Sequence, residues 1–593
     1  MTAARRSAAP GHGARRRAPA TALTVLLALL GLAVLGGCAS IPTSGPVVDG
    51  KAEPAPPLPI YLNPNPPRDD ASPEQIVNGF LSAQGPGTTS SYDVARAYLT
   101  GSATDWDPTA RVTVYRGDAG LVVPDDADDT GKTTVTGTVS VVGTIDADGV
   151  YTEVSDGTTQ DLSFGLVQDP DGRWRIDDAE DGLFIQSGLL DVFYQQTTLY
   201  FPTPDRTYFV SDERWFPKSA RWQTDAVSAV LDGPAEWLQD SVVTVAPPGT
   251  TLALQTVPVS DGVATVNLSS AVLSASAADR ALLQAQIQAV IVDSYPRTQA
   301  FEPVRSVVLS ADGTPISVDT VDPLPSAQVS GGAVAASDGR LVAVNGSTLT
   351  KIDGAPSLEG LLPTALGLTG DVAQGAAGAA VLVRDGTAHV RRLPTAGTKG
   401  ATLLEGADLM APSADRFGWI WSGSATGPIT VLDRDGTRTR LAAVPWLADR
   451  TLVSVRVAPD GARLVVASDG TGGPLVQVAG IVRDEEGRPT ALSDPFRVAA
   501  STVDVTSVVW TDQTQVGVLG RQTGEDDVVV HLAQVGGQTT SLSRVPGAVA
   551  IAAGNGESTL LVVDEKGVLY GRSESATIWV PEATDVDLVA YPG

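Results

Sequence analysis

The chain has 593 residues, with 68 acidic against 40 basic side chains and a formal net charge of −28. A surface with this excess of carboxylates repels phosphate backbones and anionic headgroups, which argues against nucleic acid as a partner. Aromatic residues are 5% of the chain, whereas glycine and proline number 61 and 41, so the composition favours strands and turns over long helices. A chain of this length is expected to hold about three domains, each with its own core.

The first 37 residues have the order of a secretory signal. Five arginines, the last of them Arg17, precede an uncharged apolar run from Thr21 to Leu35, and small residues follow it. At about 15 residues the run is shorter than the roughly 20 that a helix needs to cross a bilayer. We therefore expect residues 1–37 to be a cleaved signal peptide. Its loss leaves 35 basic and 68 acidic side chains, a net charge of −33.

The single cysteine of the chain, Cys38, directly follows this segment in Leu35-Gly36-Gly37-Cys38. This sequence resembles the bacterial lipobox. The resemblance implies cleavage between Gly37 and Cys38, a diacylglyceryl group on the Cys38 sulfur and a palmitoyl group on its amino nitrogen. Two or more acyl chains hold a soluble domain stably on a membrane. A buried core cysteine or half of a disulfide is the alternative, and the chain has no second cysteine for a disulfide.

A proline-rich segment follows the cysteine. Ten prolines occur from Pro42 to Pro73, among Asn and Asp residues and few large apolar ones. Such a composition cannot build a core and favours an extended chain that rises about 3.1 Å per residue. We expect residues 38–71 to be a tether that holds the first domain away from the membrane.

Helix and strand signals predict an α+β domain over residues 72–182. Ser72-Pro73-Glu74-Gln75 is a capping box ahead of one helix, and a second helix is expected over Tyr92–Leu99. Apolar and polar residues then alternate within short runs over Val112–Ile176, with Asp-Gly turns between the runs. Two helices followed by a curved antiparallel sheet resemble the nuclear-transport-factor-like fold. The acidic group Asp177, Asp178, Glu180 and Asp181 is expected to be a solvated linker and not a catalytic carboxylate pair.

Residues 190–322 predict a second α+β domain. A long helix is expected over Ala277–Val292, where Leu283, Ile287, Val290 and Ile291 share the stripe of a helix packed on a sheet. A shorter helix over Asp225–Leu231 ends at Asp232-Gly233-Pro234, and a strand is expected over Val263–Ser269. This order, with Pro247-Pro248-Gly249-Thr250 between the helices, resembles the GerMN module of spore-germination proteins and bacterial lipoproteins.

The sequence from residue 323 to 593 is repetitive. An apolar run, a turn and a second apolar run recur at intervals of roughly 40 to 50 residues, the length of one four-stranded propeller blade. The turns lie at Asp338-Gly339, Ala376–Gly378, Asp415-Arg416, Asp460-Gly461, Asp512-Gln513 and Asn555-Gly556. We expect a β-propeller of about six blades, with a pair of β-sandwiches as the alternative. The whole chain is then a mainly β, multidomain protein.

The opening Cys38-Ala39-Ser40-Ile41-Pro42-Thr43-Ser44-Gly45-Pro46 and the order of the domains together resemble LpqB, an actinobacterial lipoprotein family. The resemblance implies a partner: the extracytoplasmic part of the sensor histidine kinase of the Mtr two-component system. It also implies a role in cell-envelope homeostasis and division.

Residue patterns for catalysis or cofactor binding are scarce. No Gly-x-Ser-x-Gly elbow, zinc-ligand cluster or phosphate-binding loop is present, and His389 and His531 fall in strands where a structural role is expected. The turns at 146–149, 169–172 and 433–436 have carboxylates that could bind calcium, but each lacks the distal glutamate of an EF-hand loop, so hairpin turns are expected. We expect no enzyme activity, metal or cofactor.

Trp419 and Trp421 could stack on a sugar or pack in a blade. The leading hypothesis is therefore an accessory protein, lipid-anchored at the extracytoplasmic face of the cell membrane, that binds and modulates the kinase. One alternative is a protein that binds or hydrolyses envelope sugars at the propeller mouth, which requires converging carboxylates and aromatic rings there. Another is a structural scaffold for division or wall-synthesis complexes.

Overall fold

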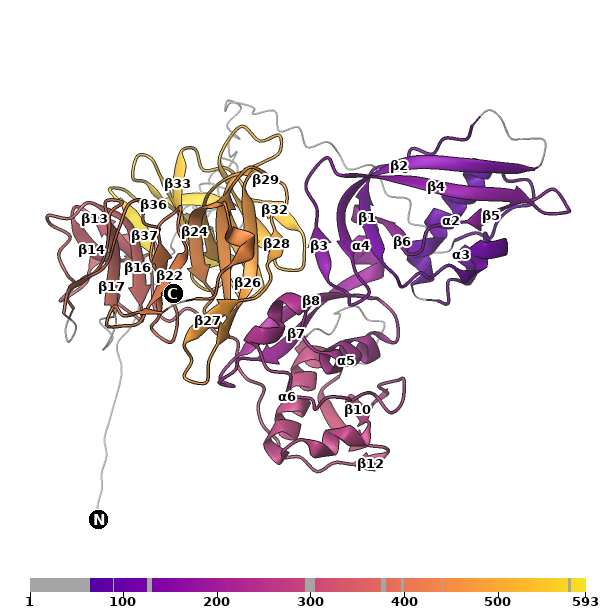
Figure 1. Cartoon of the computed structure of the whole chain (residues 1–593), viewed down its shortest axis with the longest axis horizontal. Helices are drawn as coiled ribbons and strands as arrows, with labels where there is room; N and C mark the ends of the chain where they lie inside the picture. Colours follow the sequence, from indigo (N-terminus) through magenta and orange to yellow (C-terminus); the bar gives the residue numbers. More distant parts are fainter. Residues whose placement is uncertain are drawn as a thin grey trace, which may run out of the picture. The chain divides into compact units, whose positions relative to one another are not determined.

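Strands account for 42% of the structure and helices for 15%, as the prediction of a mainly β protein requires. The structure is a computed structural model that describes residues 64–88, 90–124, 131–293, 304–374, 380–395, 399–439, 441–573 and 578–593 (Figure 1). The predicted signal peptide, Cys38 and most of the predicted tether lie outside these residues. The described residues belong to one compact unit.

The N-terminal domain begins with helix α2 (Pro73–Gly87). The predicted capping box is present: the Gln75 backbone N–H donates to Ser72 Oγ at 3.3 Å, and the Ser72 N–H donates to Gln75 Oε1 at 3.0 Å. Each bond satisfies a donor that the first turn of a helix leaves free. The apolar side of α2, which includes Phe80, is buried.

The second predicted helix is much shorter than expected. Helix α3 (Asp93–Arg96) is a single turn. Tyr92, which precedes it, has a left-handed backbone with φ of 61°, and Leu99 forms a parallel bridge with Ile176 of the sheet. Sheet pairing therefore takes over where the sequence pattern continues the helix.

The sheet of this domain has the strand order β5-β4-β2-β1-β6, and β3 pairs with β2. Strands β1 and β6 are parallel, so the sheet is mixed and not wholly antiparallel as predicted. Of the acidic group, Asp177 and Asp178 end β5, and Glu180 and Asp181 lie in the short connection to β6 within this domain, so the group is not a linker between domains; Asp178, Glu180 and Asp181 are exposed, as expected of solvated carboxylates. Helix α4 follows β6. The bounds are β1 (Val112–Arg116), β2 (Lys132–Ile145), β3 (Tyr151–Glu153), β4 (Thr159–Gln168), β5 (Trp174–Asp178), β6 (Leu183–Gln186) and α4 (Ser187–Phe193).

The second domain combines an antiparallel ribbon, β7 and β8, with a four-stranded sheet and two helices. The sheet order is β12-β11-β10-β9, and β10 and β11 are parallel. The predicted stripe of the long helix α6 is fully buried, with Ile287 at 0% exposure. The bounds are β7 (Tyr194–Pro202), β8 (Phe209–Pro217), α5 (Trp222–Asp232), β9 (Val259–Ser260), β10 (Val263–Leu268), α6 (Ala277–Asp293), β11 (Ser306–Ala311) and β12 (Thr314–Pro315).

The C-terminal region consists of six sheets of four or five strands. Their innermost strands contact one another in the order β37, β16, β20, β24, β29, β33 and back to β37, which closes a ring. The sheets are β13 (Val334–Ser337), β14 (Arg340–Asn345), β15 (Thr348–Lys351) and β37 (Leu588–Ala590); β16 (Pro363–Thr369), β17 (Ala380–Asp385), β18 (His389–Arg392) and β19 (Ala401–Glu405); β20 (Ser413–Ala414), β21 (Ile420–Gly423), β22 (Ile429–Leu432) and β23 (Arg438–Thr439); β24 (Thr451–Val457), β25 (Arg463–Asp469), β26 (Leu475–Arg483), β27 (Pro489–Leu492) and β28 (Phe496–Val498); β29 (Thr502–Trp510), β30 (Gln515–Gln522), β31 (Val529–Gln534) and β32 (Thr539–Ser541); β33 (Ala548–Ala552), β34 (Leu561–Asp564), β35 (Leu569–Arg572) and β36 (Trp579–Ala583).

The ring closes through a pairing that the sequence pattern does not reveal. Strand β37, the last of the chain, pairs with β13 and supplies the innermost strand of the first sheet. As a result the predicted turn Asp338-Gly339 joins the second and third strands of its sheet, whereas the turns at Asp415, Asp460, Asp512 and Asn555 join the first and second. The predicted turn at 376–378 lies outside the described residues.

Candidate functional site

The predicted lipidation site, Cys38, lies outside the described residues. The structure does describe the end of the predicted tether, from residue 64 onward. The Tyr98 hydroxyl donates to the Asn65 carbonyl at 2.8 Å, and Ala71 is buried against the N-terminal domain. The end of the predicted tether therefore contacts this domain at Asn65 and Ala71, whereas most residues between them are exposed. Within the described part of the chain, no helix is long and apolar enough to cross a membrane.

The most heavily charged buried region is the β7–β8 ribbon, which contacts both other domains. On one face, the guanidinium of Arg214 binds the Asp212 carboxylate at 2.8 and 3.1 Å and donates to the Asp148 carbonyl at 2.8 Å. Burial acts to lower the pKa of Arg214, but the charge of Asp212, the hydrogen bond to it and the charges of Asp146 and Asp148 together raise this pKa above its usual value. Asp212 also accepts from the Ala235 N–H at 2.8 Å. This pair joins the N-terminal domain to the GerMN-like domain.

The other face of the ribbon lies on the propeller. Ser211 Oγ donates to the Gln513 carbonyl at 2.8 Å, and Trp215 Nε1 donates to the Gly536 carbonyl at 2.9 Å. Glu213 lies between them, and a Cβ on Gly536 would come within 3.0 Å of Glu213. Burial raises the pKa of Glu213 to about 7.

A buried arginine of the propeller, Arg463, contacts the ribbon. Arg463, 1% exposed, binds the Asp460 carboxylate through Nε at 3.0 Å and Nη2 at 2.7 Å. It donates to the carbonyls of Ser211 and Gln513 at 3.3 and 2.7 Å, and its guanidinium lies 4.9 Å from the Trp510 ring. The propeller and the ribbon are thus held together by charged hydrogen bonds in a region that excludes water, where such bonds are strong.

Apolar packing continues the same contact. Side chains of the GerMN-like domain and of the β24 and β29 sheets form one continuous buried cluster, and Trp237 stacks on Phe496 with ring centroids 5.7 Å apart. Glu153 of β3 accepts from the Thr539 N–H at 3.0 Å and from the Ala500 N–H at 2.9 Å. These contacts connect all three domains.

The acidic turns singled out as possible calcium loops are hairpin turns. Asp146 Oδ1 accepts from the N–H groups of Asp148 and Val150 at 3.0 and 2.8 Å, and Asp169 and Asp433 make the same two bonds within their own turns. The hairpin interpretation is confirmed. Among the residues that the structure describes, no group of three His, Cys, Asp or Glu side chains is placed to hold a metal ion.

The two histidines of the propeller occupy strand positions. His389 begins β18, and His531 in β31 is fully buried. Ser541 lies directly opposite His531 across the β31–β32 ladder, so His531 Nδ1 is 2.9 Å from Ser541 Oγ, while Nε2 is 3.2 Å from Glu525 Oε2. Burial lowers the pKa of His531, against the charge of Glu525. Ser541 is exposed at the end of an edge strand and does not lie on the sharp strand-to-helix turn that holds the nucleophile of a Gly-x-Ser-x-Gly hydrolase.

The tryptophans singled out for sugar stacking are packing residues. Trp421 is fully buried and donates through Nε1 to Asp415 Oδ2 at 3.2 Å, and Trp419 packs partly buried against the same apolar cluster. At the propeller mouth beside Asp415, the described lining residues include this one carboxylate and no aromatic ring. Asp415 is also bound to Arg483 at 2.7 Å. The described residues that line this opening do not form the converging carboxylates and rings that the sugar hypothesis requires.

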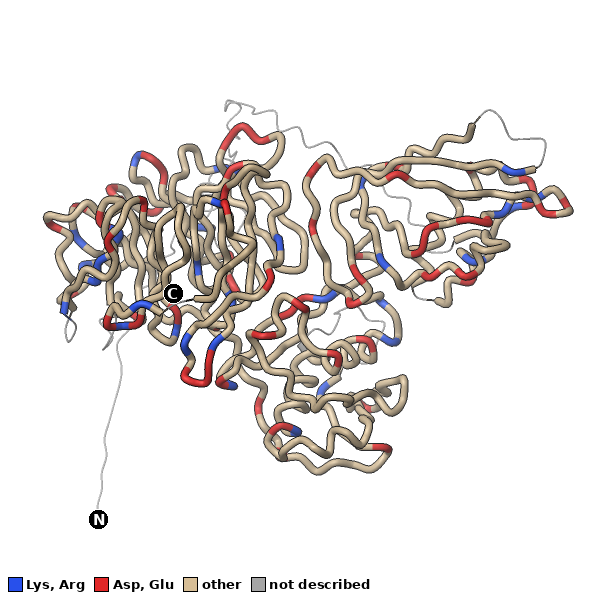
Figure 2. The backbone as a smooth tube through the Cα atoms, viewed as in Figure 1, with Lys and Arg blue, Asp and Glu red and all other residues tan. Residues whose placement is uncertain are grey.

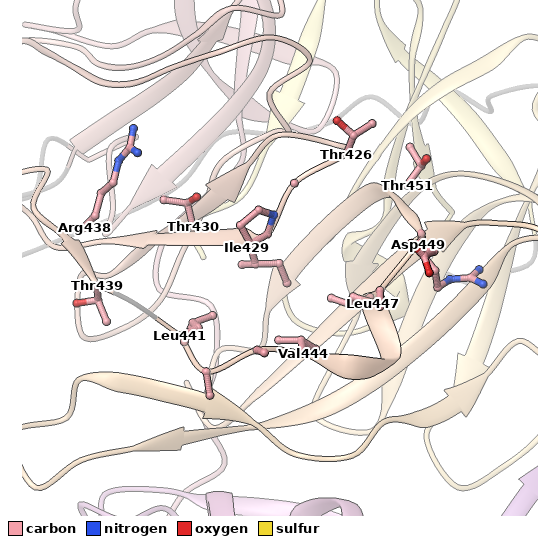
Figure 3. Close-up of a pocket in the computed structure, with 16 residues that line it drawn as sticks. Thr426, Ile429, Thr430, Arg438, Thr439, Leu441, Val444, Leu447, Asp449 and Thr451 are labelled. Carbon is pink, nitrogen blue, oxygen red and sulfur yellow. The ribbon is translucent and has the colours of Figure 1, made fainter.

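A groove of about 940 Å³ lies on the outer side of the ring, between β22, β23 and the segment that leads into β24. Figure 3 shows Ile429, Leu441, Val444 and Leu447 in its floor, with Thr426, Thr451 and Arg438 toward its rim. The segment is fixed from behind, since the Ala442 N–H donates to the Thr490 carbonyl at 2.7 Å. Its lining is mixed, because Arg438, Asp449 and Arg450 lie beside the apolar side chains.

A mixed-sheet N-terminal domain, a helix-on-sheet domain and a ring of four-stranded sheets, joined through buried ion pairs, define a multidomain β-propeller protein. Family models match all three parts: the N-terminal domain of lipoprotein LpqB over residues 66–190, a sporulation and spore germination domain over 198–317, and the lipoprotein LpqB β-propeller domain over 339–592. The chain belongs to the LpqB lipoprotein family.

Curated relatives share this organisation along their whole length. Proteins named lipoprotein LpqB are 28% identical in Cutibacterium acnes, covering 97% of this chain and 98% of the relative, and 27% identical in Mycobacterium bovis, covering 96% and 98%. A third, from Bifidobacterium longum, is 26% identical over 87% of this chain and 88% of its own length. The relatives are named as lipoproteins, as expected of a membrane-anchored protein.

Proposed function

We propose that this protein is a lipid-anchored accessory protein at the extracytoplasmic face of the cell membrane. In this proposal Cys38 carries the acyl chains, and the protein binds and modulates the sensor histidine kinase of the Mtr two-component system. Its effect is on envelope homeostasis and division, and it acts by contact and not by catalysis.

The lipobox sequence that ends at Cys38 carries the proposal, together with membership of a lipoprotein family. The partner comes from the family resemblance. A tethered protein reaches a membrane-embedded receptor at a high effective concentration, so a modest affinity is sufficient for function.

The described structure supports contact as the mode of action. The three domains are joined through Arg214, Glu153 and Arg463, so a partner meets one preformed surface and little conformational entropy is lost on binding. Figure 2 shows acidic residues on loops of every domain, which favours a partner with basic groups.

The test is capture of the purified kinase ectodomain by the chain from residue 38 onward, with Cys38→Ala to remove the need for detergent. We expect saturable binding at 50 mM salt that weakens at 300 mM, because opposite charges are screened. The matched control is the ectodomain of an unrelated sensor kinase from the same membrane. Absence of binding at every salt concentration, or equal binding of the control, would contradict the proposed partner. Unchanged kinase output on deletion would favour the scaffold alternative.

A further inference from the structure

The propeller ring encloses a narrow cavity of about 80 Å³. Residues on or beside the innermost strand of every one of the six sheets line it, including Gly367, Pro412, Arg456, Val509, Ile551 and Val589. Small and apolar side chains dominate this lining. Arg456, on β24, is its charged member.

Arg456, which is partly exposed to the cavity, differs from the buried arginines of the chain. Arg214, Arg463 and Arg483 each pair with an aspartate at 2.7 to 2.8 Å. Arg456 donates through Nη1 to the carbonyl of Val455, its own neighbour, at 3.0 Å, and no carboxylate of the described residues forms an ion pair with it. Burial, and then the charge of Arg384, lower the pKa of Arg456 to about 10. A guanidinium that lines a narrow, largely apolar cavity without a counter-ion keeps only part of its hydration, so an anion beside it is favourable.

The way into this cavity is also basic. A second cavity of about 330 Å³ shares Pro459, Pro592 and Gly593 with the first and is lined by Arg392, Arg416 and Arg434. Arg416 is paired with Asp205, and the Asp415 carboxylate is bound to Arg483. Arg392 donates to backbone carbonyls, those of Arg434 and Lys399. The chain as a whole has a net charge of −28, whereas this passage is lined by arginines. Positive charges between low-dielectric walls attract anions into the passage.

We propose that the propeller channel binds a compact oxyanion, the phosphate or carboxylate group of a small molecule, at the guanidinium of Arg456. The planar guanidinium offers parallel N–H donors that match two oxygens of such a group. One water needs roughly 10–15 Å³ of cavity measured in the same way, so the inner cavity accommodates an anion of a few heavy atoms. A larger ligand would place its uncharged part in the outer cavity, beside Arg392.

The experiment is isothermal titration calorimetry of the full-length purified chain with inorganic phosphate, acetate and glycerol phosphate at constant ionic strength. We expect saturable one-site binding of at least one of them, and at least a tenfold weaker affinity for Arg456→Met. Arg340→Met, which removes an exposed arginine of the same propeller, should bind as the wild type does. Tighter binding of glycerol phosphate than of phosphate would assign the outer cavity to the ligand's organic part, and equal binding would assign the site to the free anion.

Two further measurements test the proposal even if Arg456→Met does not fold. Arg456→Lys keeps the charge but loses the paired donors, so it should bind measurably more weakly than the wild type. In the wild type itself, the binding anion should raise the unfolding temperature above that in chloride of equal ionic strength. The proposal is overturned if no anion binds the wild type saturably, or if a folded Arg456 variant binds as tightly as the wild type.

Discussion

Replacing Arg463 with methionine removes one positive charge from the contact between the propeller and the β7–β8 ribbon while keeping most of the side-chain volume. Four hydrogen bonds are lost: two to the Asp460 carboxylate and one each to the carbonyls of Ser211 and Gln513. Asp460 is 4% exposed, so its carboxylate stays buried with the Ala462 N–H as a donor and no cation.

The loss of unfolding free energy should be large for a single interdomain contact. Removing one partner of a buried ion pair destabilises a protein by about 3–5 kcal/mol, since the remaining charge has no water to solvate it. The matched control is Arg521→Met, whose pair with Asp504 is 39% and 45% exposed. An exposed pair contributes about 0–1 kcal/mol.

The assay is urea unfolding followed by tryptophan fluorescence, with limited proteolysis of residues 317–333 between the ribbon domain and the propeller. We expect a lower free energy of unfolding and faster cleavage for Arg463→Met than for Arg521→Met. The double variant Asp460→Asn, Arg463→Met should lose less than the sum of the single variants, because the two residues act as a pair. Equal losses for the two arginine variants would refute the reasoning.

Three further changes have defined outcomes. Because burial raises the pKa of Glu213 from 4.5 to about 7, its carboxyl stabilises the fold below pH 4.5 and this stabilisation is lost as the pH rises to about 7. Glu213→Gln should therefore gain on the order of 3 kcal/mol over the wild type between pH 4.5 and pH 8 in thermal unfolding, and a constant difference would contradict this. Ser72→Ala should destabilise α2 by about 1 kcal/mol in hydrogen exchange, whereas Ser72→Asp keeps the cap; equal effects would exclude the capping box. Ile287→Ala on α6 should cost about 2–5 kcal/mol in urea unfolding, and a loss below 1 kcal/mol would show that the site is not packed.

Features with a local cause could be predicted from the sequence. The capping box at Ser72, the buried stripe of α6 around Ile287 and the propeller turns at Asp460 and Asp512 each depend on residues close together in the chain. Their side-chain spacing alone determines the structure that forms.

Features that depend on distant segments could not be predicted from the sequence. Strand β37 has three residues and pairs with β13 at the other end of the propeller, so no local pattern marks it. The run Ser211–Arg214 has the polarity of an exposed strand, and its burial follows from partners such as Asp148, Arg463 and Gln513 in other parts of the chain. Arg456 likewise looks like an ordinary strand residue until the ring closes around it.

Metabolic labelling with a palmitate analogue, followed by membrane fractionation of the wild type and of Cys38→Ala, tests the anchor on which the account depends. The wild type should take up the label and sediment with membranes, and the variant should do neither. An unlabelled wild type, or a variant that is labelled and membrane-bound to the same extent, would contradict the account.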